Sequence, residues 1–236
     1  MLRAAVILLI AAFLPAQTPQ ALMESRAGTI KSLSAELEQS LAVMGTTQSM
    51  TGRVRFLAPE LFRMDLTMTV GEMTISTLTV SNGKTLTVYT DMLGVAQTFD
   101  LARVRAVHKD WTGEAMAPGR PFQDYEPGSV KALGEETVDG VPCLRFEARP
   151  RGNPQTAQAL PDLALARLWL AKADGFPRRV VFLDKAGTAL FTQTYRAVTV
   201  NPLLDPAIFL FRPPEGVKTV DSTDLILKTL GGKEKE

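Results

Sequence analysis

The feature that most constrains the fold of this chain is a strict two-residue alternation of side-chain type across positions 62–70. Every even position in this segment is apolar, and every odd position is polar or charged. Successive side chains of a β-strand point to opposite faces of its sheet. The segment is therefore predicted to be a half-buried strand with one apolar and one polar face.

Short segments of the same kind recur along the chain, separated by turn residues. Asn82-Gly83 and Asp139-Gly140 are strong hairpin turns, and Pro59 separates the first two strands. We find no internal repeat and no convincing linker. The pattern predicts one mainly β (α+β) domain with a curved antiparallel sheet or open barrel. Its strands are expected near residues 54–56, 62–70, 75–80, 86–88, 96–99, 130–133, 136–138, 143–148, 166–171, 178–183 and 189–198, with a final extended piece at 208–211.

Three segments have a helical rather than a strand period. Apolar residues recur at spacings of three and four from Ile30 to Leu41, which predicts an amphipathic helix ending at Gly45. A short helix is expected near residues 101–107. Another is expected over 222–230, followed by a charged, mobile end. The first of these helices is predicted to cover one face of the sheet.

Two irregular features interrupt the series of strands. The apolar positions change phase between Ile75 and Leu78, which indicates a β-bulge or a bend. Two loops rich in Pro and Gly, residues 110–128 and 150–161, have no regular period. We therefore expect both segments to be loops.

The first residues are organised like a secretory signal peptide. Arg3 provides a positive charge, and an apolar run of about eleven residues follows before Pro15. A transmembrane helix needs about 20 apolar residues, so a membrane anchor is the less favoured interpretation. We expect an exported, soluble protein with a signal peptide over 1–21 (cleaved after Ala16 or Ala21), a domain over 22–221 and a short helix with a mobile charged tail over 222–236.

Charge and the scarcity of reactive residues exclude several classes of function. Lys and Arg number 26 against 25 Asp and Glu, so no long-range field attracts nucleic acid. One histidine, His108, and one cysteine, Cys143, leave almost no material for a His/Cys metal site or a Cys-His nucleophile. No common catalytic motif occurs. We expect neither catalysis nor a cofactor, and a buried role for Cys143.

His108 belongs to a local basic cluster with Arg103, Arg105 and Lys109. The cluster is interpreted either as a solvated helix face or as a contact for an acidic partner or a lipid headgroup. Methionine is the other compositional signal, because four of the nine methionines fall between positions 64 and 92. Methionine adapts to irregular apolar partners. The apolar face of 62–70 is therefore either an ordinary core or the lining of an adaptable cavity.

Three segments together resemble the periplasmic lipoprotein carrier family of the LolA type. Residues 79–89 (TVSNGKTLTVY) are similar to that family's strand-turn-strand VSDGKTLWxY. Residues 52–64 (GRVRFLAPELFRM) resemble its first hairpin, and residues 205–217 (DPAIFLFRPPEGV) resemble its closing motif. A fourth segment, 133–143 (LGEETVDGVPC), looks like the broader lipoprotein-sorting relatives. The order of the segments matches the family across roughly residues 30–221.

The resemblance implies a half-open antiparallel β-barrel with helices as a lid over a hydrophobic cavity. It implies a monomeric periplasmic carrier that binds acyl chains of lipoproteins or lipids and moves them towards the outer membrane. An inner-membrane ABC transporter and an outer-membrane receptor are the implied partners, with no cofactor. The expected cavity lining is Val54, Phe56, Phe62, Met64, Leu66, Met68, Val70, Ile75, Val80, Leu86 and Val88.

One position departs from the family pattern. Well-known members carry an arginine directly before the hairpin proline, where it is thought to hold the lid, and here that residue is Ala58. Arg55 and Arg63 lie nearby but are predicted on the polar face. The two loops, 110–128 and 150–161, are also longer than those members require. The alternative interpretation is a periplasmic lipid-sensing regulatory or interaction module of the same fold, which binds an anti-sigma factor.

Overall fold

The computed structural model describes residues 17–43, 46–107, 118–152 and 159–231. Its strands are β1 (Ser32–Val43), β2 (Thr46–Leu57), β3 (Leu61–Val70), β4 (Met73–Asn82), β5 (Thr85–Thr90), β6 (Val95–Asp100), β7 (Lys131–Val138), β8 (Val141–Ala148), β9 (Leu165–Ala171), β10 (Pro177–Leu183), β11 (Ala189–Val200) and β12 (Lys218–Asp221). The helices are α1 (Pro19–Ala27), α2 (Leu101–Val107) and α4 (Thr223–Gly231), with 3-10 turns η1 (Asp91–Leu93) and η2 (Pro206–Phe209).

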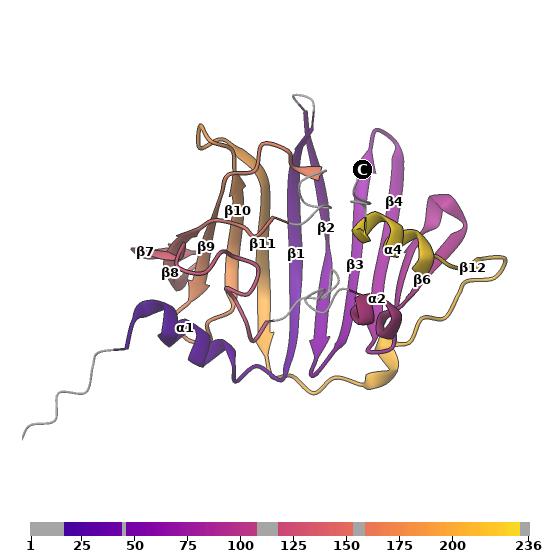
Figure 1. Cartoon of the computed structure of the whole chain (residues 1–236), viewed down its shortest axis with the longest axis horizontal. Coiled ribbons are helices and arrows are strands. Elements are labelled where there is room, and N and C mark those ends of the chain that lie inside the picture. Colours follow the sequence, from indigo (N-terminus) through magenta and orange to yellow (C-terminus); the bar gives the residue numbers. More distant parts are fainter. Residues whose placement is uncertain (1–16, 44–45, 108–117, 153–158, 232–236) are drawn as a thin grey trace, which may run out of the picture.

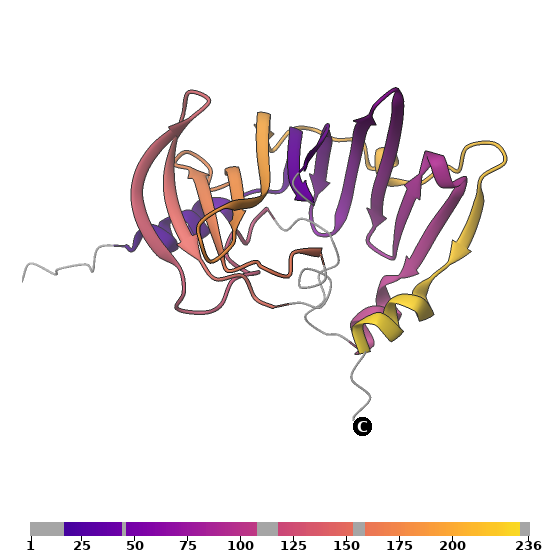
Figure 2. The same cartoon turned by 90° about the horizontal axis from the view of Figure 1, so that it is seen from above.

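All of these strands belong to one sheet that does not close. Its order is β12-β6-β5-β4-β3-β2-β1-β11-β10-β9-β8-β7, so β12 and β7 form its two edges. Every pairing is antiparallel except that of β12 with β6. Figure 1 shows the sheet face-on, and Figure 2 shows that it curves, with α2 and α4 on the concave side. The predicted half-open antiparallel architecture is confirmed.

Residues 201–217, here called the strap, run along the convex side of the sheet between β11 and β12 (Figure 2). Arg63 of β3 donates from Nη1 to the carbonyl oxygen of Ile208 at 3.1 Å, which fixes the strap to the sheet. The extended piece predicted at 208–211 is confirmed only in part, because Pro206–Phe209 is a 3-10 turn and extended backbone begins at Leu210. Phe209 is buried there and ties the strap to β4 and β5.

The helix predicted from Ile30 to Leu41 is wrong, because this segment is strand β1. Its buried residues include Leu33, Ala35, Leu37 and Gln39, which follow a period of two. Ala35 is small and Gln39 is polar, so neither was recognised as a buried position. The remaining leucines fit the spacing of three and four that is typical of a helix. β1 lies near the middle of the sheet, paired with β2 and β11, so both of its edges are hydrogen-bonded.

The helix that does precede the sheet is α1, which lies within and just after the predicted signal peptide. Thr18 caps it by accepting a hydrogen bond from the Ala21 backbone nitrogen. Met23 and Ala27 are fully buried against the sheet. Gly175 permits this contact, since a Cβ atom there would lie 2.4 Å from the carbonyl oxygen of Met23.

Other expected elements are confirmed with small changes. α2 and α4 occupy the two short helical segments, and Asn82-Gly83 and Asp139-Gly140 form hairpin turns with positive φ at Gly83 and Gly140. The two strands expected at 130–138 form one strand, β7, whose register shifts near Gly134. No helix among the described residues is long and apolar enough to cross a membrane. The proposed mobile end after Gly231 lies outside the described residues.

Candidate functional site

The predicted lining residues occupy the concave face, with one exception. Directly paired residues of neighbouring strands share a face, and the register pairs Val54 with Met64, Phe56 with Phe62 and Met68 with Ile75. The side chains sharing this face are Val54, Phe56, Phe62, Met64, Leu66, Met68, Val70, Ile75, Leu86 and Val88. The alternation in the sequence therefore correctly predicted that these residues share one surface, which spans β2 to β5.

Val80 is the exception, because it lies on the convex face opposite Arg63. The expected bulge between Ile75 and Leu78 is also wrong, since β4 keeps an unbroken register with β3 from Met73 to Asn82. The phase change has a different cause. Leu78 and Val80 face the strap, so β4 has apolar contacts on both of its faces.

Burial on the concave face decreases toward the β3–β4 hairpin. Phe62 and Leu86, near the other end of their strands, are buried. Met64, Met68, Ile75 and Val88 are half-buried, and Val70 is 45% exposed. In addition, Met73 at the hairpin is 61% exposed. The described side chains thus leave a partly uncovered apolar surface on this half of the face.

The other half of the concave face is filled by the chain itself. Phe122 and Tyr125 from the loop after residue 118, together with Met23 of α1, pack against Phe146 and Leu168. The Phe122 and Phe146 rings meet edge to face, with centroids 5.0 Å apart. Between the two halves, Gln39 of β1 donates to Gln193 of β11 at 2.8 Å. The apolar surface is therefore divided into a packed half and a partly open half.

Helices α2 and α4 lie over the concave side near β6, the strand next to the β12 edge (Figure 2). Leu101 and Val104 of α2 are buried, whereas Val107 is 61% exposed. Two ion pairs hold α2: Arg105 to Glu60 in the β2–β3 turn at 3.1 Å, and Arg103 to Asp224 of α4 at 2.6 Å. Both arginines of the predicted basic cluster are therefore paired within the chain. His108 and Lys109 lie outside the described residues.

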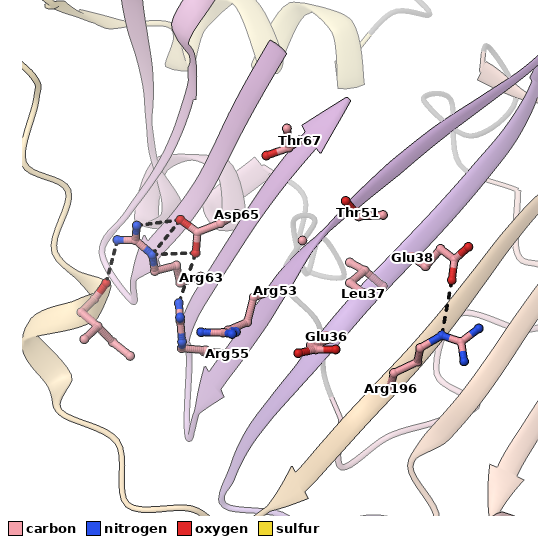
Figure 3. A pocket seen from close by; sticks show the side chains of 12 residues that line it. Glu36, Leu37, Glu38, Thr51, Arg53, Arg55, Arg63, Asp65, Thr67 and Arg196 are labelled. Atoms are coloured by element: carbon pink, nitrogen blue, oxygen red, sulfur yellow. Dashed lines mark hydrogen bonds and ion pairs between the residues drawn. The ribbon is translucent and has the colours of Figure 1, made fainter. Parts of the chain in front are cut away.

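A second candidate site is a charged pocket of about 900 Å³ on the convex face. We name it the charged pocket, and Figure 3 shows its side chains. Strands β11, β1, β2 and β3 form its floor, and Ile208 of the strap borders it. Its lining is Glu36, Leu37, Glu38, Thr51, Gly52, Arg53, Arg55, Arg63, Asp65, Thr67, Arg196 and Ile208.

The charges in this pocket are unevenly paired. Asp65 accepts from Arg63 at 2.7 Å and from Arg55 at 3.2 Å, so one carboxylate serves two guanidinium groups. On the opposite side, Arg196 contacts Glu38 at 3.4 Å and Asp139 at 2.8 Å. The basic charge therefore concentrates on β2 and β3, as Figure 3 shows.

The sequence had placed Arg55 and Arg63 on the polar face but had not identified this pocket. The available signal was the Pro59 hairpin, which sets Arg55 directly opposite Arg63 and Arg53 opposite Asp65. Gly52 gave a weaker signal. A Cβ atom there would lie 1.9 Å from the carbonyl oxygen of Asp65, so only glycine permits the close approach of β2 to β3.

The side chains that most often bind metal ions are scattered over the described residues. No group of three or more His, Cys, Asp or Glu side chains among them is arranged to hold a metal ion. Cys143 is fully buried on β8, and burial raises the pKa of its thiol above the ordinary value. A buried, protonated thiol is a poor nucleophile and metal ligand.

No protein-family model and no curated protein matches this sequence. An uncharacterised conserved protein from Thermus thermophilus is 15% identical, with a TM-score of 0.56 over 84% of this chain and 96% of that chain. A putative outer membrane lipoprotein-sorting protein domain from Vibrio parahaemolyticus is 14% identical, with a TM-score of 0.41 over 80% and 95%. MucB of Pseudomonas aeruginosa, solved with MucA, is 14% identical, with a TM-score of 0.43 over 81% and 59%.

The Thermus structure shows that the fold is shared, and at this identity the likeness concerns the fold alone. The other two similarities are too low to support an argument. The arrangement itself is a largely antiparallel sheet that stays open, with helices on its concave side. This is the architecture that the sequence resemblance implied.

Proposed function

We propose that this protein is a periplasmic carrier that binds an acyl chain of a lipoprotein or lipid on the concave face of β2–β5. The observation that carries the proposal is the partly uncovered apolar surface formed by Met64, Met68, Ile75 and Val88. An ordinary core would bury these side chains as fully as it buries Phe62. An acyl chain lying along them would complete their burial.

The energetics of transfer fit this surface. Each methylene removed from water contributes about 0.8 kcal/mol, so a chain of about sixteen carbons favours an apolar site by about 12 kcal/mol. The free energy of binding to a carrier must be close to this transfer free energy, so that the carrier holds the acyl chain and can still release it. Half-buried, adaptable methionine side chains suit a site that releases its ligand.

The proposal includes the cellular location of the protein and the proteins with which it exchanges cargo. The predicted signal peptide, resembling those of exported proteins, would place the mature chain in the periplasm. There the carrier would receive its cargo from an inner-membrane ABC transporter and deliver it to an outer-membrane receptor. The balanced charge of the chain means that such docking would rely on local patches.

The test is the identity of whatever co-purifies with the protein from the periplasm. Native mass spectrometry of the mature chain should show an added mass that disappears after organic extraction, and the extract should contain acyl chains. Empty protein that also fails to bind a fluorescent fatty acid would contradict the proposal.

A second candidate is a periplasmic lipid-sensing module that passes its signal to another protein. The charged pocket favours it, because that pocket lies on the face opposite the apolar surface and is open to a partner. Affinity capture from a periplasmic extract separates the two candidates. An anti-sigma factor as the main partner would favour the sensor, and a transporter or receptor would favour the carrier.

A further inference from the structure

The basic side of the charged pocket carries more positive charge than its neighbours neutralise. Arg55 and Arg63 are directly opposite each other across β2 and β3, an arrangement that is unfavourable for like charges. Asp65 is the carboxylate they share. The Arg53 side chain is exposed and makes no ion pair or hydrogen bond with any described residue. Its cross-strand neighbour Glu36 is likewise exposed, on the acidic β1 side.

The arginines nearest the strap are held in position before any ligand arrives. Arg63 donates to Asp65 through Nε at 2.9 Å and Nη2 at 2.7 Å, and to the Ile208 carbonyl through Nη1. Arg55 donates through Nη1 to Asp65. A guanidinium has five N–H donors, so Arg55 and Arg53 retain donors for a further acceptor. Because Asp65 already holds Arg55, less side-chain entropy is lost when an acceptor binds Arg55.

The strap shows how this surface can bind a polypeptide segment. It is a non-regular segment lying across the convex face, and an arginine of the floor holds one of its main-chain carbonyl groups. The charged pocket continues beside it toward β1 and β11, with a volume of about 900 Å³. A second extended segment laid alongside the strap would meet Arg55 and then Arg53. Carboxylates match these guanidinium groups in geometry and charge.

We propose that the charged pocket is a docking site for an extended acidic segment of a partner protein. The partner's Asp or Glu side chains pair with Arg53 and Arg55, and its main chain runs beside the strap. The headgroup of an acyl chain bound on the concave face does not reach this pocket, because the whole sheet lies between the two faces. The inference is therefore independent of the proposed cargo.

The test uses a fluorescein-labelled peptide of alternating Glu and Ser residues and measures fluorescence anisotropy with the mature protein. We expect saturable binding that weakens as salt rises. Arg53→Glu should weaken this binding by at least about tenfold. Arg120→Glu is the matched control, because Arg120 is also exposed but lies in the loop after residue 118. It should change the affinity by less than about twofold.

Three outcomes would overturn the proposal: no saturable peptide binding, equal losses in the two variants, or displacement of the peptide by inorganic phosphate as effectively as by unlabelled peptide. The last result would mean a simple anion site. Fatty-acid binding is measured on the same samples, and Arg53→Glu should leave it unchanged. If the wild-type protein binds no fatty acid, this result contradicts the proposed carrier function and leaves the docking site unaffected.

Discussion

The guanidinium of Arg105 on α2 lies 3.1 Å from the carboxylate of Glu60 in the β2–β3 turn. The resemblance implied that an arginine before the hairpin proline holds the lid, and Ala58 occupies that position here. The ion pair joins the same two parts of the fold with the arginine on the helix instead of on the turn. α2 is thus tied to the hairpin whose apolar side chains form the proposed cargo surface.

Glu60→Gln should loosen α2 and speed release of a bound fluorescent fatty acid several-fold. Both partners are more than a third exposed, so the free energy of unfolding should fall by less than about 1 kcal/mol. Stopped-flow displacement measures the release rate, and thermal denaturation measures stability. Glu135→Gln is the control, because its pair with Lys172 is also more than a third exposed but remote from α2. Identical release rates in the two variants would show that the Arg105–Glu60 ion pair does not hold α2 over the cargo surface.

Gly52→Ala should destabilise the protein, because the added methyl group would collide with the carbonyl oxygen of Asp65 across the strand pair. Overpacking of this kind costs about 2 kcal/mol, and the obstacle is backbone and cannot rotate away. Gly152→Ala is the control, since a Cβ there meets nothing within 4 Å. Equal melting temperatures for the two variants would show that β2 and β3 are not so closely apposed.

The strand pattern was predictable wherever one face is apolar and the other polar, as between Phe62 and Val70. The prediction failed where this contrast is lost. β1 carries Ala35 and Gln39 among its buried residues, so its leucines alone suggested a helix. On β4, the strap buries Val80 on the face opposite Ile75. A segment more than 120 positions away along the chain caused that burial, and no local pattern can reveal such a contact.

The charged pocket could not be predicted from the sequence for a related reason. Its residues come from four strands, and β11 is separated from β1 by most of the chain. Alternation indicated that Arg53, Arg55 and Arg63 are on a polar face, but it did not indicate that Asp65 is shared between two of them. That relation depends on the β2–β3 register.

Cys143 should react slowly with a thiol-alkylating reagent in the native protein and rapidly after denaturation. Its side chain is fully buried, and burial raises the pKa of the thiol, which keeps it protonated near neutral pH. The unfolded chain loses this proton at a lower pH, so the free energy of unfolding should decrease as pH rises above the ordinary thiol pKa. Labelling kinetics followed by mass spectrometry measure the effect. Equal native and denatured rates would contradict the burial of this thiol.

The mature chain should begin at Gln17, after cleavage behind Ala16. Cleavage behind Ala21 would remove the Thr18 cap and the first turn of α1, whose Met23 and Ala27 are buried in the core. The intact mass of periplasmic protein distinguishes the two sites. A chain beginning at Leu22 that is as stable as one beginning at Gln17 would show that this first turn contributes nothing.

Cargo is proposed to lie on the concave face of β2–β5, and a pair of neighbouring residues on β3 tests this location. Met68 faces that side and is half-buried, whereas Thr67 faces the convex side and is exposed. A carboxylate at position 68 would need to be desolvated by a bound acyl chain, but one at position 67 would stay in water.

The decisive measurement is the dissociation constant of a fluorescent fatty acid for Met68→Glu and Thr67→Glu, with thermal denaturation confirming that both variants fold. We predict that Met68→Glu weakens binding by at least about tenfold and that Thr67→Glu changes it by less than about twofold. Equal affinities in the two folded variants would contradict the account.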